Sequence, residues 1–187
     1  MKILFITAEQ PEAEACLRAC RETGVDARVV FSGMGAEATE SKMAEMLSSG
    51  EKYDYVIDAG IAGTFDGSPS GAAFNVIEER HGEAPDTILT GAKPLFGWLP
   101  CVSGLTIQVM TEDAGEVERR KALGAQVESM EGASFFQMCH KYGVENFAEL
   151  RTISNAVGES DRSRWDTGAG IESIYVNCRR FLEGLKK

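Results

Sequence analysis

Carboxylates stand at two points of the sequence where an apolar, strand-like run passes into a helix. Glu9, Glu12 and Glu14 follow the run KILFIT in the segment TAEQPEAE, and Glu131 follows VESM. An ionised carboxylate accepts hydrogen bonds from two hydroxyls at once, and it can also serve as a general base. A glutamate at a helix start also interacts favourably with the helix N-terminus, so capping alone explains each position as well as catalysis does.

Glycine and small polar side chains mark two further strand ends. In DAGIAGTF, Gly60 and Gly63 flank Ile61 and Ala62, and glycine lets a ligand approach the backbone closely. In RTISNAVG, the pair Ser154 and Asn155 ends an apolar strand. Because tight turns use the same residue types, neither motif alone specifies a site.

The elements that must position these residues alternate between strands and helices. We expect strands at residues 2–7, 26–31, 53–59, 104–111, 125–130 and 149–155, with shorter ones at 72–78 and 87–89. We expect helices at residues 11–24, 36–47, 115–124, 131–143 and 170–185. This alternation predicts a single α/β domain over residues 1–187, with ligands at the carboxyl ends of its strands.

Composition disfavours several functional classes. A formal net charge of −10 argues against a nucleic-acid partner, because such partners are bound through clustered Lys and Arg. No apolar run approaches membrane-spanning length, and the N-terminal run lacks a signal-peptide cleavage site. The five cysteines and two histidines form no zinc spacing, so buried thiols are the better interpretation. We therefore predict a cytoplasmic protein without a zinc site.

Taken in order, the motifs resemble those of the nucleoside phosphorylase and nucleosidase superfamily, in particular its hydrolytic branch with methylthioadenosine/S-adenosylhomocysteine nucleosidase and futalosine hydrolase. The matching segments are MKILFITAEQPE, SGMG, DAGIAGTF, VESMEGASFF and RTISNAVGESDRSRW. The resemblance implies a three-layer α/β/α sandwich with a central mixed sheet and a purine nucleoside as substrate. It also implies a homo-oligomer, a dimer or larger, in which neighbouring subunits often complete the 5′ pocket.

The resemblance also implies roles for individual residues. Glu12 falls at the position of the family's water-activating glutamate, with Glu14 and Glu9 as neighbouring alternatives. Glu131 falls at the position of the glutamate that accepts hydrogen bonds from the 2′ and 3′ hydroxyls, and Met130 would pack against the sugar. Further substrate contacts are expected from Ile61, Gly63 and Ser154.

Asn155 predicts which purine is released. The adenine-specific nucleosidases have an aspartate at this position. An amide can donate to O6 of hypoxanthine while its carbonyl accepts from a protonated N7. An adenine nucleoside would lose a matched contact unless the side chain flips, at a cost of about 1–3 kcal/mol. We therefore predict that futalosine is hydrolysed to hypoxanthine and dehypoxanthine futalosine on the route to menaquinone, with Asn155 as a catalytic residue.

Three further positions are candidates with alternatives. Futalosine carries a benzoate, and Arg164 could bind its carboxylate, although a surface pair with Asp161 or Asp166 explains that arginine equally well. Phe65 or Trp165 could stack on the purine, although each could also belong to the core.

Asp58, which precedes Gly60, would repel a phosphate dianion and so favours water as the nucleophile. The alternative functions are a methylthioadenosine/S-adenosylhomocysteine or aminodeoxyfutalosine nucleosidase and a purine nucleoside phosphorylase. A nucleoside-binding protein without catalysis is a third alternative.

Overall fold

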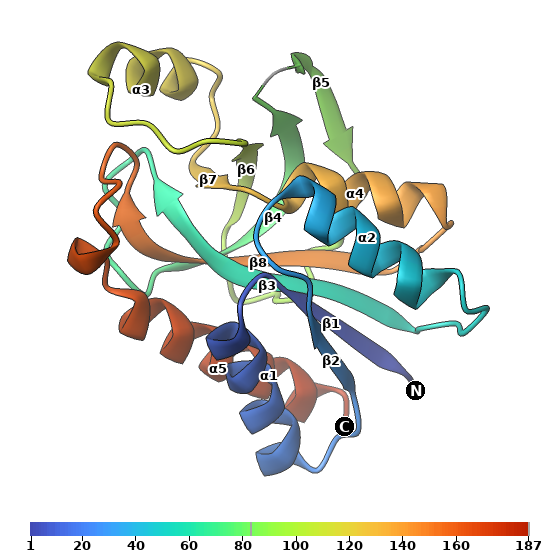
Figure 1. Cartoon of the computed structure of the whole chain (residues 1–187). Coiled ribbons are helices and arrows are strands. Elements are labelled where there is room, and N and C mark those ends of the chain that lie inside the picture. The colour runs from blue at the N-terminus through green and yellow to red at the C-terminus, as the bar shows by residue number, and fades with distance from the viewer. Residues whose placement is uncertain (83, 187) are drawn as a thin grey trace.

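The computed structural model describes residues 1–82 and 84–186 and shows one mixed sheet with helices packed around it (Figure 1). The strands are β1 (Ile3–Thr7), β2 (Arg28–Phe31), β3 (Tyr55–Thr64), β4 (Ala73–His81), β5 (Ala84–Thr90), β6 (Cys101–Thr106), β7 (Val127–Ser129) and β8 (Phe147–Ala156). The helices are α1 (Gln10–Thr23), α2 (Ala36–Leu47), α3 (Ala114–Lys121), α4 (Gly132–Lys141) and α5 (Thr167–Gly184), with a 3-10 turn at Arg162–Arg164.

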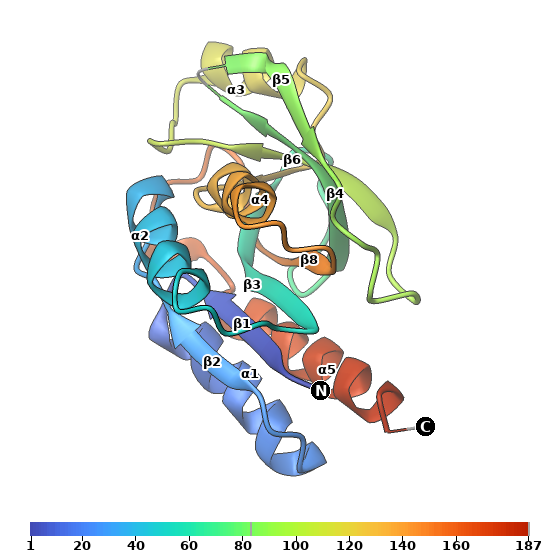
Figure 2. The ribbon, with the colours of Figure 1, turned by 90° about the vertical axis from the view of Figure 1, so that its right-hand side faces the viewer.

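Strand β1 lies between two helical layers. Ile3 and Phe5 pack in the core with α1 and α5, whereas Leu4 and Ile6 pack with α2 and α4. Successive side chains of a strand point to opposite faces, so a strand covered on both faces is apolar at every position. Figures 1 and 2 show α1 beside α5 below the strands and α2 beside α4 above them. The predicted α/β/α arrangement around a mixed sheet is confirmed.

The sheet curls until part of it closes. β3 pairs in parallel with β1 and β8, and β8 pairs antiparallel with β4. β4 continues to β6 and β6 to β7 in parallel, and a short antiparallel ladder joins β7 back to β3. Strands β3, β8, β4, β6 and β7 therefore form a ring.

Four strands differ most from the sequence-based prediction. β3 does not stop before the glycines but runs to Thr64, because Ile61 and Gly63 pair with β8 and this pairing outweighs the weak strand propensity of glycine. The strand expected at 104–111 ends at Thr106, where its neighbour β7 also ends and offers no further partner. β4 and β5 form a longer hairpin than the short strands expected there.

Within residues 1–82 and 84–186, no helix has the length and apolarity to cross a membrane. The same residues hold no group of three or more His, Cys, Asp and Glu side chains arranged for a metal ion. The cysteines are free thiols, and Cys101 is exposed instead of buried, because it begins β6 at the rim of the sheet.

Candidate active site

A pocket of about 310 Å³ lies at the carboxyl ends of β1 and β8, next to the last residues of β3. Its volume is within the range of small-molecule sites, which begins at about 300 Å³. The predicted site residues that line it are Glu12, Ile61, Gly63, Met130, Glu131, Ser154 and Asn155. Arg164 does not line it. Strand ends that are far apart in the sequence therefore bring the predicted carboxylates and amide to one cavity.

Glu12 is buried at the start of α1. Its carboxylate accepts hydrogen bonds from the backbone N–H groups of Ala8 (3.0 Å), Glu9 (2.8 Å) and Ile61 (2.9 Å). Burial raises the pKa of Glu12 to about 7, although the N–H groups of Ile61 and Glu9 and the charge of Arg151 act to lower it. A carboxyl group whose pKa is near neutrality is well matched to accept a proton at neutral pH.

The two neighbouring glutamates lie differently. Glu14 is exposed on α1, where it accepts a hydrogen bond from Gln10 (2.7 Å). Glu9 lies at the edge of the pocket and forms an ion pair with Arg162 (2.7 Å). Of the three glutamates, Glu12 is the one buried inside the pocket, which favours Glu12 as the base.

Glu131 lies between β7 and α4, and its side chain is buried. Its Oε1 accepts from the backbone N–H of Gly35 (2.9 Å), and its Oε2 accepts from that of Met130 (3.2 Å). Gly35 has a φ of 90°, which glycine adopts without strain, so the turn SGMG can direct its N–H at the carboxylate. The remaining lone pairs of Glu131 are free to accept from sugar hydroxyls.

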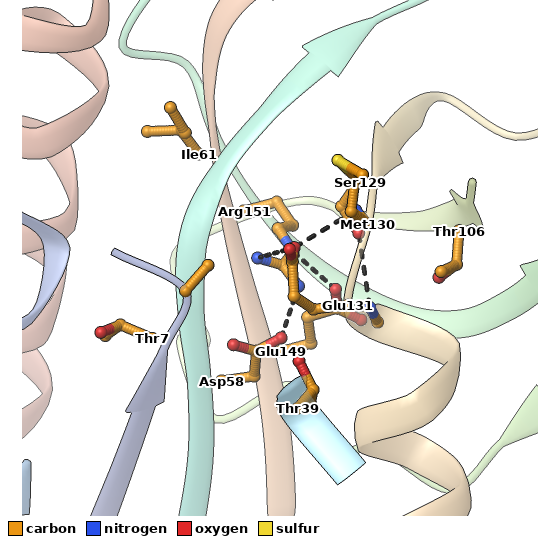
Figure 3. A network of polar contacts seen from close by, with 12 residues as sticks. Thr7, Thr39, Asp58, Ile61, Thr106, Ser129, Met130, Glu131, Glu149 and Arg151 are labelled. Atoms are coloured by element: carbon orange, nitrogen blue, oxygen red, sulfur yellow. Dashed lines mark hydrogen bonds and ion pairs between the residues drawn. The ribbon is translucent and has the colours of Figure 1, made fainter. Parts of the chain in front are cut away.

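Arg151 connects the site to the core, and motif reasoning misses it. This buried residue of β8 donates to Glu149 (2.6 Å) and to Asp58, and its Nη1 lies 3.9 Å from Oε2 of Glu131 (Figure 3). The guanidinium balances carboxylates from β3, β8 and the start of α4, which a buried cluster requires. The sequence signal for Arg151 is a charged residue inside the predicted core strand ELRTISN.

A further carboxyl group lies beside this cluster. Glu79 of β4 is fully buried and accepts a hydrogen bond from the hydroxyl of Thr106 (2.8 Å). Burial, reinforced by the charge of Glu149, raises the pKa of Glu79 well above its usual range. A Cβ atom at Gly104 or Gly132 would overlap the Glu79 carboxyl group, so both positions require glycine. Burial therefore favours the protonated form of Glu79, whose side chain fills the space beneath the start of α4.

Asp58 does not face the pocket. Its side chain is 1% exposed and binds Arg151 below the cavity. The expectation that Asp58 repels phosphate is therefore corrected: its charge is compensated by the guanidinium and is not presented to a ligand.

The amide of Asn155 has a defined orientation at the end of β8. Its Oδ1 accepts from the hydroxyl of Ser154 (2.8 Å), and its Nδ2 donates to the carbonyl of Ala156 (2.9 Å). A carbonyl only accepts, so a flipped amide would bring Oδ1 against the Ala156 oxygen and lose that bond. One N–H and one lone pair of the Asn155 amide remain available to a ligand.

The segment after β8 places Arg164 away from the pocket. Its side chain is 70% exposed and pairs with Glu159 (3.2 Å) and Asp161 (3.7 Å), because the 3-10 turn points it outward. The predicted role of Arg164 in substrate binding is corrected accordingly. The same turn brings Arg162 to the pocket instead.

Of the two stacking candidates, one lines the pocket. Trp165 does so, with its indole N–H bound to the carbonyl of Glu159 (2.8 Å). Phe65 packs in the core with Leu105 and Ile107 and does not line the pocket. The loop after β6 also contributes lining residues that no strand-end motif marks, namely Ile107, Met110 and Thr111.

Known proteins are similar to this chain in sequence and in fold. Residues 100–183 match the family model described as the Phosphorylase superfamily. The chain is 32% identical over 151 residues to the futalosine hydrolase of Thermus thermophilus, an alignment that spans 66% of this chain and 67% of that protein. The chain belongs to the futalosine hydrolase family. The resemblance inferred from the motifs is thereby confirmed.

Other members and structures agree with this assignment. The futalosine hydrolase of Acidothermus cellulolyticus is 34% identical over 89 residues, which span 46% of this chain and 36% of that protein. The solved futalosine hydrolase of Helicobacter pylori has a TM-score of 0.79 at 18% identity and covers 100% of this chain and 97% of that chain. A methylthioadenosine/S-adenosylhomocysteine nucleosidase from Colwellia psychrerythraea, solved with adenine, has a TM-score of 0.79 at 21% identity, covering 100% of this chain and 95% of that chain. These two structures share the fold.

Proposed function

We propose that this chain is an N-glycosidase that hydrolyses futalosine to hypoxanthine and dehypoxanthine futalosine, a step of menaquinone biosynthesis. Its futalosine hydrolase relatives support the reaction. The observation that carries the proposal is the fixed amide of Asn155, in a pocket that also contains Glu12 and Glu131. We propose one catalytic domain over the whole chain, without a metal or an organic cofactor.

Cleavage of an N-glycosidic bond passes through a transition state with positive charge on the sugar. In the proposed reaction Glu12 takes a proton from a water molecule, and the water oxygen bonds to the anomeric carbon. The electron pair of the C–N bond moves onto the purine, whose N7 takes a proton from solvent, and Glu12 returns the proton of the attacking water to solvent. Asn155 stabilises this leaving group by accepting from N7–H and donating to O6.

Charge in the pocket favours both the sugar cation and water as nucleophile. Among the described residues that line it, five are acidic: Glu9, Glu12, Glu128, Glu131 and Glu159. Ionised carboxylates near the sugar stabilise positive charge as it develops. The same carboxylates repel a phosphate dianion, which replaces the argument from Asp58 and disfavours a phosphorylase.

The orientation of Asn155 disfavours an adenine nucleosidase. Binding the exocyclic amine of adenine would need the amide oxygen where Nδ2 now donates to the carbonyl of Ala156. The flip would remove this exposed hydrogen bond, at a cost of about 0.5–1.5 kcal/mol. A 6-oxopurine can bind the amide of Asn155 in its present orientation, without a flip.

We also propose that the chain acts in the cytoplasm as a homo-oligomer. Apolar side chains stand exposed at and beside the pocket: Met34 (54%), Val109 (71%) and Met110 (39%). A second copy that covers them would remove apolar surface from water and narrow the 5′ end of the pocket. Sedimentation velocity of the purified protein tests this, and a monomer at micromolar concentration would contradict it.

The reaction itself is tested by offering the purified protein futalosine and inosine, each with and without phosphate, and measuring free hypoxanthine. We expect release from futalosine at the same rate with or without phosphate. Strict dependence on phosphate would indicate a phosphorylase, and absence of release would indicate a binding protein.

A further inference from the structure

The pocket has one side chain that could attract an anion. Among the described residues that line it, Arg162 is the basic one, and the charged side chains around it are carboxylates. Like-charge repulsion would otherwise exclude a substrate that carries a carboxylate.

Arg162 is held at the mouth of the pocket. Its Nη2 lies 2.7 Å from Oε2 of Glu9, and its Nη1 lies 3.7 Å from the sulfur of Met34. The guanidinium also sits 5.2 Å from the ring centre of Trp165, in the range of a cation–π contact. The 3-10 turn that carries it is fixed by Asp161, which accepts from the backbone N–H of Ser163 (3.0 Å). The guanidinium is therefore positioned before a ligand arrives.

The two groups that Arg162 contacts belong to the segments that hold the catalytic carboxylates. The N–H of Glu9 donates to Glu12 (2.8 Å), and the N–H of Gly35, directly after Met34, donates to Glu131 (2.9 Å). A nucleoside with its base at Asn155 and its hydroxyls at Glu131 must direct its 5′ substituent toward the opening, where Arg162 is partly exposed.

We infer that Arg162 binds a carboxylate on the 5′ substituent of the substrate and so selects nucleosides that carry one. In the empty pocket Glu9 occupies the guanidinium. A substrate carboxylate replaces it in a bidentate pair, and Glu9, whose side chain is 32% exposed, turns toward water. This inference rests on the proposed function, because the benzoate of futalosine supplies the carboxylate, whereas methylthioadenosine and inosine have none.

The test compares Arg162→Met with Arg164→Met as the matched control, since Arg164 is two residues away and outside the pocket. Each protein is assayed with futalosine and with its methyl ester, which removes the negative charge alone. For Arg162→Met we expect KM for futalosine to rise about tenfold with kcat retained, the size of a partly exposed charge-assisted contact. KM for the ester should not change, and Arg164→Met should resemble the wild type with both substrates.

Unchanged turnover of the ester shows that Arg162→Met is folded. Equal losses with both substrates, or equal effects of the two substitutions, would overturn the inference. Glu9→Gln offers a second test with the opposite sign, because it removes the competing carboxylate and should lower KM for futalosine; a higher KM would contradict the exchange. If the wild-type protein releases no hypoxanthine from either substrate, the proposed function fails, and the inference fails with it.

Discussion

Replacing Glu12 by glutamine should abolish catalysis and change how stability depends on pH. Burial raises the pKa of Glu12 from its ordinary value of 4.5 to about 7. Between these two values the native state keeps a proton that the unfolded chain has released, so the free energy of unfolding falls as pH rises. At 1.36 kcal/mol for each pH unit, the loss amounts to about 3 kcal/mol and is complete above about pH 7.

Glutamine resembles the protonated form and does not titrate, so Glu12→Gln should not show this loss. Its oxygen can still accept from Ala8 and Glu9, but its amide nitrogen meets the N–H of Ile61. That mismatch costs about 1–3 kcal/mol at every pH. As pH rises from acidic to mildly basic, the free energy of unfolding of the variant should therefore increase by about 3 kcal/mol relative to that of the wild type. For a chain of this size this corresponds to about 6–12 °C in Tm.

The assay is urea denaturation of both proteins from about pH 5 to about pH 8, with hypoxanthine release measured in parallel. For the wild type, kcat/KM should rise tenfold with each pH unit below about pH 7 and then level off. Glu14→Gln, an exposed change on the same helix, is the control and should alter neither property. Parallel stability curves for Glu12→Gln and the wild type, or turnover retained in Glu12→Gln, would refute the reasoning.

Three further substitutions test other parts of the site. Arg151→Met leaves Asp58, Glu149 and Glu131 without their cation, so urea denaturation should show a loss of about 3–5 kcal/mol that shrinks at acidic pH; a loss independent of pH would contradict the electrostatic cause. Burial favours the neutral form of Glu79, so Glu79→Gln should change stability at neutral pH by less than about 1 kcal/mol, and a larger loss in the same urea titration would contradict this. Glu131→Gln replaces one of the oxygens proposed to bind the sugar hydroxyls by a donor and should lower kcat/KM for futalosine by about 30-fold to 150-fold, the equivalent of about 2–3 kcal/mol. An unchanged kcat/KM would show that another residue binds the ribose hydroxyls.

Local patterns predicted the layers and most of the site. The apolar run of β1 marked a strand end with Glu9, Glu12 and Glu14, and VESM marked another with Glu131. The resemblance to the nucleosidase family, and not the local pattern, selected Glu12 among the three. These positions could be predicted because the strand end and the helix start next to them are both marked in the sequence. The side chain then has little choice of direction.

The sequence could not show the features that depend on contacts between residues distant in the chain. The burial of Asp58 follows from its pairing with Glu149 across β3 and β8, and no local pattern reveals that Arg151 neutralises both. The sequence pattern does not distinguish Arg162 from Arg164. Only the geometry of the 3-10 turn places Arg162 at the pocket, where it pairs with Glu9.

The central claim is that the amide of Asn155 selects a 6-oxopurine nucleoside for hydrolysis. Futalosine and aminodeoxyfutalosine differ only at C6, so the ratio of their kcat/KM values measures this selection directly. The orientation of Asn155 predicts that futalosine is preferred by about 2-fold to 12-fold, the equivalent of about 0.5–1.5 kcal/mol, and that Asn155→Asp shifts the ratio toward aminodeoxyfutalosine. A ratio near one or in favour of aminodeoxyfutalosine for the wild-type protein would contradict the claim.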